Sequence, residues 1–338
     1  MAITVRPRIP GARPAGPRAA PGSGVRIGAV ALLDVILGYD CNLWCDYCTI
    51  TSEMRRRALT SRQVLAELRQ GRALGYDAVS FTGGEPTIRG DLLPLIRAAR
   101  ELGYSDVKVQ SNGLLFGEAN VERMVAAGVT RIHVSIHTHE RGRYERLVQR
   151  EGTYDLMVHG LRNVLRQPLR VVADVILKSG TYRDLPDAVR WLHGLGVREA
   201  HLWFVSLTDG NRANVTSMPR MSDVAPVMRE AFDLAAELRL ELLSLHVPRC
   251  LLGEPYVERA LDPGAGRVRV VTPEAVFELR DSKITPTVHV PACEGCPHRP
   301  VCPGLRPDYL EVYGDAEVAA ARGQPPTRHP TRPLRVVG

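Results

Sequence analysis

The stretch LLDVILGYDCNLWCDYC, residues 32–48, joins an apolar run to three closely spaced cysteines. The first six residues are apolar except for one aspartate, a pattern typical of a buried β-strand. Cys41, Cys45 and Cys48 follow in the spacing C-x3-C-x2-C. Because ligands of α/β proteins bind at the carboxyl ends of strands, this stretch predicts a strand that delivers three thiols to a ligand site.

Outward from this stretch, apolar runs of strand length alternate with amphipathic segments of helical length. The expected strands are 32–37, 78–81, 107–110, 131–136, 171–177 and 200–205, and the expected helices between them are 61–74, 91–102, 121–127, 154–165 and 185–195. Glycines at 75, 103, 128 and 196 are expected to end four of these helices. Repeated strand–helix units predict an α/β fold with a parallel sheet, which either closes into a barrel or stays open.

Composition divides the chain into four parts. Residues 27–220 carry the strand–helix alternation. Residues 221–317 begin with an expected helix at 223–238 and strand at 240–247, then turn Pro/Gly-rich, and we place the boundary between the two parts at about residues 215–240. The ends, 1–26 and 318–338, contain nine arginines and no acidic residue. Such Pro/Arg-rich tails usually stay disordered, either solvated or in contact with an acidic partner.

The charge and apolar content exclude several classes of protein. The formal charge is +7, but without the nine arginines of the two ends it becomes −2, so nucleic-acid binding is not expected of the folded part. No apolar run approaches the 18 residues of a membrane span, and the N-terminus lacks the apolar segment of a signal peptide. The expected location is therefore the cytoplasm, where clustered cysteines indicate metal ligation and not disulfides.

The first three cysteines suit a polynuclear iron–sulfur cluster. A four-iron cluster normally takes four cysteines, so a set of three leaves one iron with an open coordination position. A structural zinc ion is the alternative, and it would need a fourth ligand. The closest histidine in the sequence is His133.

Two short polar motifs follow the second and third expected strands. TGGEP, at residues 82–86, contains Gly83 and Gly84, which let the backbone approach a ligand closely, and Glu85, which can accept hydrogen bonds from an ammonium group. Ser111 and Asn112 precede a glycine after the third strand. Either motif alone also predicts an ordinary turn.

The segment CNLWCDYC, residues 41–48, resembles the signature of the radical S-adenosylmethionine (SAM) superfamily, in which the residue before the third cysteine is aromatic, here Tyr47. The resemblance covers about residues 30–210. It implies a partial (β/α)6 TIM-type barrel and a [4Fe–4S] cluster on the three cysteines, whose open iron binds SAM. An electron, from a donor such as a flavodoxin or ferredoxin, would split SAM into methionine and a 5′-deoxyadenosyl radical. That radical would take a hydrogen atom from the substrate.

The later motifs agree with this resemblance in kind and order. The family carries GGEP after the second strand, where it binds the amino group of SAM, and a Thr-Asn-Gly motif after the third. The cofactor-binding residues implied are Tyr47, Gly83, Gly84, Glu85, Ser111, Asn112 and Ser135. The expected fifth strand lacks the glycine that many relatives have there, and Lys178 beyond it is a candidate partner for a carboxylate. His137 and His139 either line the substrate pocket or have no direct role.

Cys293, Cys296 and Cys302 form a second cluster of thiols in the spacing C-x2-C-x5-C, and Cys250 stands alone before them. Four thiolates suit a second, fully ligated [4Fe–4S] cluster. The region resembles the auxiliary-cluster (SPASM/Twitch-like) domains of radical SAM enzymes that include peptide maturases and the molybdenum-cofactor cyclase. Two alternatives are a structural zinc ion and a Cys250 that is only a buried thiol.

The leading hypothesis is a radical SAM oxidoreductase or maturase. Its substrate would be a ribosomally made peptide or a small molecule of a biosynthetic pathway. The alternative, from another class, is a non-catalytic iron–sulfur or zinc protein that acts as a redox sensor or scaffold.

Overall fold

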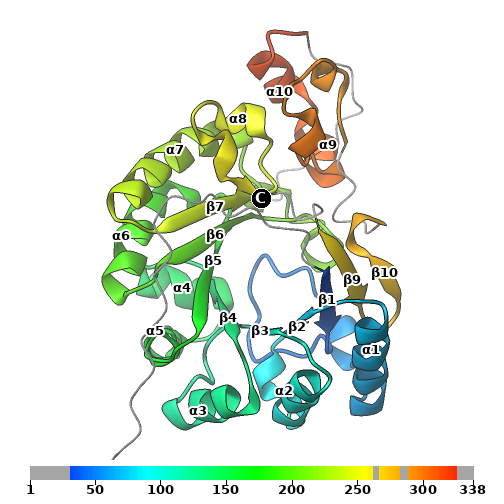
Figure 1. Ribbon diagram of the computed structural model, residues 1–338. Coiled ribbons are helices and arrows are strands. Elements are labelled where there is room, and N and C mark those ends of the chain that lie inside the picture. The colour runs from blue at the N-terminus through cyan, green and yellow to red at the C-terminus, as the bar shows by residue number, and fades with distance from the viewer. Residues whose placement is uncertain (1–30, 262–265, 282–287, 326–338) are drawn as a thin grey trace, which may run out of the picture.

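The computed structural model describes residues 31–261, 266–281 and 288–325 (Figure 1). Its strands are β1 (Ala31–Ile36), β2 (Ala78–Thr82), β3 (Asp106–Ser111), β4 (Arg131–Ile136), β5 (Arg170–Leu177), β6 (Glu199–Phe204), β7 (Glu241–Leu245), β8 (Ala260–Leu261), β9 (Arg267–Val271) and β10 (Val276–Glu278). Its α-helices are α1 (Ser61–Ala73), α2 (Leu92–Glu101), α3 (Glu118–Ala127), α4 (Arg141–Val148), α5 (Thr153–Leu165), α6 (Leu185–Leu195), α7 (Met221–Glu237), α8 (Arg249–Leu252), α9 (Pro307–Tyr313) and α10 (Ala316–Ala321).

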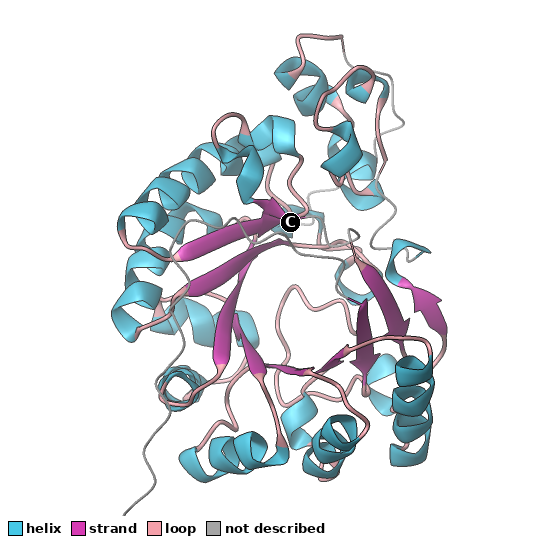
Figure 2. Cartoon of the chain, in the orientation of Figure 1, coloured by secondary structure: helices cyan, strands magenta, loops and turns pink. Residues whose placement is uncertain are grey.

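The strands form one curved sheet in the order β10-β9-β1-β2-β3-β4-β5-β6-β7-β8. All neighbouring strands are parallel except β9 and β10. The sheet does not close, because β10 and β8 are its two edges, and helices α1 to α7 lie along its outer side (Figure 2). The prediction of an α/β fold with an open, partial barrel is therefore confirmed. No helix in the described part of the chain is long and apolar enough to cross a membrane.

The six strands predicted from the sequence correspond to β1–β6, with differences of one residue at most ends. Four helix-ending glycines have positive φ angles, +83° at Gly75, +91° at Gly103, +109° at Gly128 and +101° at Gly196, a conformation that glycine adopts without strain. The expectations missed α4 and the short strands β8–β10. These elements are too short, or too polar, to show a clear period.

The division into domains stays a prediction, although two observations bear on its boundaries. Strand β7 pairs in parallel with β6, so the sheet continues past residue 220. The expected C-terminal tail starts too early, because α10 covers residues 316–321 and buries Val318 and Ala319. The remainder of that tail, 326–338, and the N-terminal tail 1–26 lie outside the described residues.

The two faces of the sheet differ in polarity, and this difference positions the site. On β1, Leu33 and Val35 are fully buried and belong to the apolar core that the outer helices cover, whereas the alternate residue Asp34 is only half-buried. On β3, Val107 and Val109 are buried while the intervening Lys108 is partly exposed. The sheet thus presents polar side chains on the face opposite the helices.

Helix α5 packs unusually close to the loop after β3. A Cβ atom added to Gly160 would lie 2.1 Å from the carbonyl oxygen of Gly113 and 3.0 Å from Cβ of Phe116. Asn163, one turn along the helix, donates a hydrogen bond of 2.8 Å to the Phe116 carbonyl. The absence of a side chain at residue 160 therefore sets the position of the β3–α3 loop.

Replacing Gly160 by alanine should destabilise the protein by about 2 kcal/mol, because the added methyl group meets backbone that has no room to move. Urea unfolding of the Gly160→Ala protein measures this effect. Gly194→Ala is the matched control, since Gly194 is also helical but has no heavy atom within 4 Å of an added Cβ. The Gly194→Ala change should stabilise the protein by up to about 1 kcal/mol, because alanine has a higher helix propensity than glycine. Equal effects of both changes would contradict the packing argument.

Candidate active site

The cysteine loop begins where the chain leaves β1 and is held by the loop that follows β2. The Gly84 amide donates to the Gly38 carbonyl at 2.9 Å, and the Glu85 amide donates to the Asp40 carbonyl at 2.8 Å. A Cβ atom on Gly84 would lie 2.0 Å from the Asp40 carbonyl oxygen, and one on Gly83 would lie 2.2 Å from that of Gly38. Gly83 also has a φ of +134°. These two glycines are thus required by close backbone packing against the start of the cysteine loop.

The other side of the cysteine loop rests on the end of α4. The amides of Trp44 and Asp46 donate to the carbonyls of Val148 and Leu147, at 3.2 and 2.9 Å. Arg55 donates to the Cys41 carbonyl at 2.8 Å and to the Leu43 carbonyl. Helix α4, which the sequence pattern did not reveal, is therefore a direct support of the cysteines.

Cys41, Cys45 and Cys48 are half-buried and close enough to affect one another's ionisation. Burial raises the pKa of Cys45, and the neighbouring thiols of Cys48 and Cys41 raise it further. Burial likewise raises the pKa of Cys41. Thiolates packed in this way need a positive charge among them, which iron ions provide when the thiolates ligate a cluster.

A single zinc ion and an iron–sulfur cluster require different spacings of their thiolate ligands. Zinc binds thiolates at about 2.3 Å, which places tetrahedral ligands about 3.8 Å apart. Among the described histidine, cysteine and acidic side chains, one group of three has all its ligand atoms within 4.8 Å of one another. That group contains no cysteine. A polynuclear cluster accepts more widely spread thiolates than a single zinc ion does.

Glu85 is the centre of a buried polar group beside the cysteine loop. It is 2% exposed, and its carboxylate accepts from the Ser111 hydroxyl at 2.8 Å and the Asn112 amide at 2.7 Å. Thr87 donates to the same carboxylate. Burial raises the pKa of Glu85, and these donors oppose the rise. The structure thus brings together three residues that the sequence placed after two different strands.

Asn112 links this group to the thiols. Its side-chain amide donates to the Asn42 side chain at 2.7 Å and lies 4.0 Å from the Cys41 sulfur. A cavity of about 360 Å³ adjoins the group and is lined by Leu37, Gly38, Asp40, Ala58, Thr82, Glu85, Pro86, Ile88 and Arg89. The volume falls within the range of small-molecule sites.

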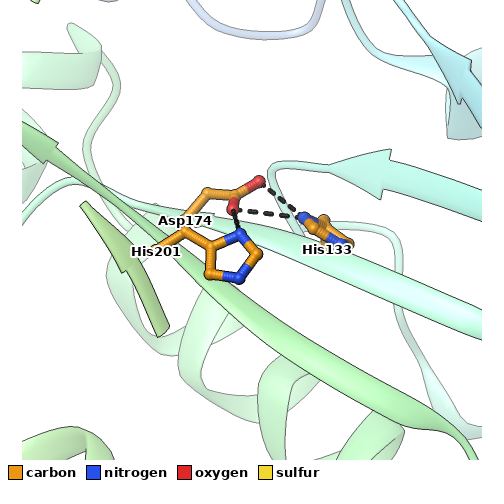
Figure 3. A group of neighbouring side chains, drawn as sticks. All are labelled: His133, Asp174 and His201. Carbon is orange, nitrogen blue, oxygen red and sulfur yellow. Dashed lines mark hydrogen bonds and ion pairs between the residues drawn. The ribbon is translucent and has the colours of Figure 1, made fainter. Parts of the chain in front are cut away.

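Ser135 lies on β4, in register with Asp174 of β5. Asp174 is itself buried between His133 and His201 (Figure 3). Burial raises the pKa of Asp174, but the two histidines outweigh that effect and hold it below its usual range. The sequence suggests His133 only as a distant zinc ligand and does not single out Asp174 or His201. Their one signal was that polar residues occupy the middle of otherwise apolar strands.

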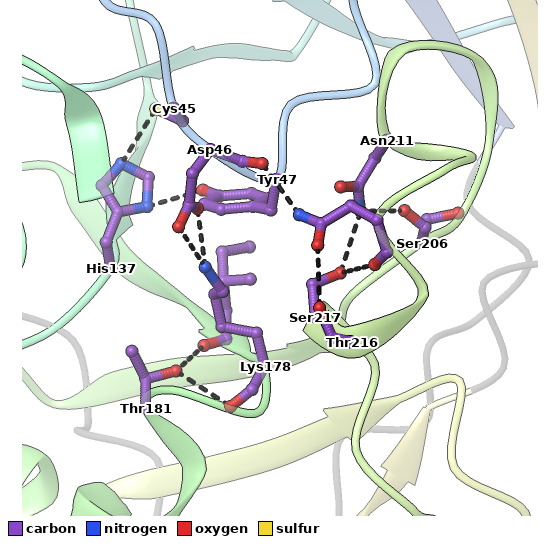
Figure 4. A network of polar contacts seen from close by, with 12 residues as sticks. Cys45, Asp46, Tyr47, His137, Lys178, Thr181, Ser206, Asn211, Thr216 and Ser217 are labelled. Carbon is purple, nitrogen blue, oxygen red and sulfur yellow. Dashed lines mark hydrogen bonds and ion pairs between the residues drawn. The ribbon is translucent and has the colours of Figure 1, made fainter. Parts of the chain in front are cut away.

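His137 and Tyr47 meet next to the cysteines (Figure 4). The His137 Nδ1 atom lies 2.6 Å from the Tyr47 hydroxyl, and its Nε2 atom lies 4.0 Å from the Cys45 sulfur. Burial lowers the pKa of His137 to about 4, with Lys178 adding to the effect. Of the two histidines considered from sequence, His137 therefore lies at the site as a neutral side chain. The backbone carbonyl of His139 accepts a hydrogen bond of 2.6 Å from the Tyr154 hydroxyl.

Lys178 has the carboxylate partner that its charge suggested. Its ammonium nitrogen lies 2.6 Å from both carboxylate oxygens of Asp46, and 5.6 Å from the centre of the Tyr47 ring. Asn214 donates to the Asp46 carbonyl at 3.0 Å. The loop between the second and third cysteines is therefore held from β5 and from the segment after β6 (Figure 4).

The four remaining cysteines come together at a second place. Cys250, Cys293, Cys296 and Cys302 line one small cavity, with Pro248, His289 and Arg299 among its other walls. Burial raises the pKa of Cys250 to about 12, and the other three thiols contribute to that rise. Cys250 is thus a neighbour of the other three thiols and not an isolated buried residue.

Two buried arginines fix the segments that carry these cysteines. Arg249, next to Cys250, donates to the carbonyls of Val301 and Ala260 at 3.1 and 2.9 Å. Arg306 is 3% exposed, pairs with Asp308 at 2.6 Å and donates to the carbonyl of Phe204, at the end of β6. The second thiol group is therefore tied to the carboxyl end of the sheet.

Comparison with known proteins agrees with this arrangement. Residues 35–192 match the model of the radical SAM superfamily. A curated relative, "Probable GTP 3',8-cyclase" of Saccharolobus solfataricus, is 28% identical over 172 residues, which cover 50% of this chain and 55% of the relative. The protein of the same name from Sulfurisphaera tokodaii is 24% identical over 70% of this chain and 77% of its own length. The chain thus spans about half the length of the first of these relatives.

Solved structures with the same fold are more distant in sequence. Streptococcus suis SuiB, bound to precursor peptide SuiA, superposes with a TM-score of 0.54 at 17% identity, over 63% of this chain and 48% of SuiB. Native anSMEcpe with bound AdoMet and a peptide gives a TM-score of 0.53 at 15% identity, over 63% of each chain. These likenesses concern the fold alone. The family match and the thiol-bearing loop at the end of β1 show that residues 35–192 form a radical SAM domain.

Proposed function

We propose that this chain is an enzyme that cleaves SAM reductively and removes a hydrogen atom from a peptide or small-molecule substrate. The observation that carries the proposal is the meeting of Cys41, Glu85, Ser111 and Asn112 at the carboxyl ends of three neighbouring strands. Cys41, Cys45 and Cys48 would hold the [4Fe–4S] cluster that the family implies. When bound, that cluster supplies the electron that splits SAM into methionine and a 5′-deoxyadenosyl radical.

Glu85 is suited to hold the amino group of SAM. Its Oε1 atom accepts from Thr87 and Ser111, and its Oε2 atom accepts from the Asn112 amide. The Thr87 hydroxyl also donates to Oε1, so Oε1 accepts three hydrogen bonds, whereas Oε2 accepts one and keeps an acceptor site for an ammonium donor. Ser111 and Asn112 keep the carboxylate oriented, and Gly83 and Gly84 bring the backbone of the same loop against the cysteine loop. Ser135, on the neighbouring strand, would contact the ribose or carboxylate of SAM.

Tyr47 and His137 would shield the cluster and orient its loop. Their contact of 2.6 Å fills the space behind Cys45. Because His137 is neutral, it does not place a second positive charge next to that of Lys178. These two side chains would thus help to keep water away from the thiols.

The second thiol group would hold an auxiliary [4Fe–4S] cluster with four cysteine ligands, which exchanges an electron with the substrate or with a donor such as a flavodoxin or ferredoxin. The names of the relatives and of the structural neighbours suggest two substrate classes, a nucleotide such as GTP and a ribosomal peptide. Adding GTP or a candidate precursor peptide to the reconstituted enzyme, and comparing the rates of 5′-deoxyadenosine formation, distinguishes the two classes. The non-catalytic sensor remains the competing proposal.

Replacing Cys48 by alanine should reduce 5′-deoxyadenosine formation to the level without enzyme, because two thiolates do not hold a site-differentiated cluster. The measurement is chromatography of the products after anaerobic reconstitution with iron, sulfide, SAM and dithionite. The auxiliary cluster should remain, so that about half of the iron stays bound. A wild-type protein that forms no 5′-deoxyadenosine with any candidate substrate would instead favour a redox sensor.

Glu85→Gln should raise the KM for SAM roughly tenfold or more, since it removes the negative charge that would face an ammonium group. The iron content should be unchanged, because Glu85 is not a ligand of the cluster. Glu101→Gln is the matched control, since Glu101 is exposed at the end of α2. An unaltered KM in the Glu85 variant would show that the amino group of SAM binds elsewhere.

Replacing Cys250 by alanine should lower the iron content by up to half and remove the electron paramagnetic resonance signal of one of two reduced clusters. Formation of 5′-deoxyadenosine should persist, whereas formation of the final product should fall. If Cys250→Ala retains the iron content of the wild type, Cys250 is not a ligand. If zinc is found in place of the lost iron, the auxiliary site is structural.

A further inference from the structure

Three neighbouring strands each contribute one side chain of a kind that can ligate metal ions, and the three side chains meet in one buried cluster. His133 of β4, Asp174 of β5 and His201 of β6 face one another in the interior of the sheet (Figure 3). Asp174 is in register with His201 on one side and with Ser135 on the other. The side chains of His133, Asp174 and His201 are 6%, 2% and 14% exposed. None of the three belongs to the proposed cluster or SAM contacts.

The ligand atoms of this group are close enough for one ion. His133 Nδ1 lies 3.1 Å from Asp174 Oδ2, and His201 Nδ1 lies 3.9 Å from Asp174 Oδ1. All three ligand atoms lie within 4.8 Å of one another. A tetrahedral zinc ion with ligands at about 2.0–2.1 Å holds them about 3.3 Å apart, so shifts on the order of 1 Å at the side-chain tips close the site.

Neighbouring polar side chains hold the three residues in place. In metal sites, hydrogen-bond partners behind the ligands have the same effect. The other ring nitrogen of His201, Nε2, lies 3.1 Å from Glu199 Oε1, and Arg170 holds Glu199 in turn at 2.7 Å. A carboxylate on the far nitrogen of a ligating histidine is a common feature of metal sites. Trp203 Nε1 donates to Asp174 Oδ1 at 3.0 Å, which fixes the carboxylate plane.

The alternative is that His133, Asp174 and His201 form only a hydrogen-bonded network. That alternative leaves two features of the three residues unexplained. Among the described residues, the ion-pair partners of the buried Asp174 carboxylate are only the two histidines. Burying a carboxylate costs several kcal/mol unless cations or hydrogen-bond donors offset that cost. His133 Nε2 is also buried without a hydrogen-bond partner in the described structure. A bound cation removes the first of these costs directly.

We propose that His133, Asp174 and His201 bind one divalent transition-metal ion, separate from both cysteine sites. Two imidazoles and one carboxylate form a donor set that suits zinc or ferrous iron. Three protein ligands leave at least one coordination position, which water or an oxygen atom of the substrate can take. The proposed metal site uses no residue of the proposed SAM chemistry. A negative result for one proposal therefore does not count against the other.

Zinc binding by the full-length, cluster-loaded protein tests the proposal. The protein is incubated without oxygen with a small excess of zinc and desalted, and its zinc and iron contents are measured. The wild type should retain one zinc ion per chain with its iron unchanged. Asp174→Asn, which keeps the side-chain shape and the acceptor for Trp203, should bind zinc at least tenfold more weakly.

The matched control is His159→Ala, because His159 is an exposed histidine on the outer helix α5, and it should retain wild-type zinc binding. Equal zinc binding by wild type and Asp174→Asn would overturn the proposal. X-ray absorption at the zinc edge provides a second test that does not depend on the stability of a variant. Nitrogen and oxygen neighbours at about 2.0–2.2 Å are expected, whereas sulfur at about 2.3 Å would place the zinc at the cysteines and also overturn the proposal.

Discussion

Close packing between two backbone segments, Gly83–Gly84 after β2 and Gly38–Asp40 after β1, determines the geometry of the whole site. The Gly84 and Glu85 amides donate to the carbonyls of Gly38 and Asp40, in space that no side chain at residues 83 and 84 would fit. Asp40 is the residue before the first cysteine, and Glu85 is the central carboxylate. One contact therefore sets both the start of the thiol loop and the position of Glu85. A second contact of the same kind, between Gly160 and Gly113, sets the loop that carries Ser111 and Asn112.

The residues that could be predicted from the sequence are those that belong to a short local pattern, either an apolar strand or a motif directly after one. Alternating apolar residues located β1 to β6, and the strand-end motifs followed because parallel strands bring their carboxyl ends to one edge. The supports of these residues were not predictable, because they depend on pairings distant in sequence. Lys178 reaches Asp46 across 132 residues, and helix α4, which holds the cysteine loop, has too polar a face to be recognised by period. The sequence grouped Cys250 with the other three thiols, but not the support of that group, in which Arg249 binds the carbonyl of Val301 next to Cys302.

The polar interior of the sheet follows from its open form. A closed barrel fills its interior with layers of apolar side chains, whereas here the interior-facing positions carry Ser80, Lys108, His133, Asp174 and His201. Such residues are stable there only when they pair with one another or with a ligand. The sequence signals this only weakly, because each residue is a single polar position within an apolar strand, and its partners lie on other strands.

The segments outside residues 35–192, the range of the family match, also support the site. Strand β9 pairs with β1, and Glu274, which follows it, accepts a hydrogen bond of 2.7 Å from Tyr39, two residues before Cys41. Asn214 binds the carbonyl of Asp46 inside the cysteine loop, and Arg306 binds the end of β6. The part of the chain that carries the second thiol group is thus in direct contact with the support of the first.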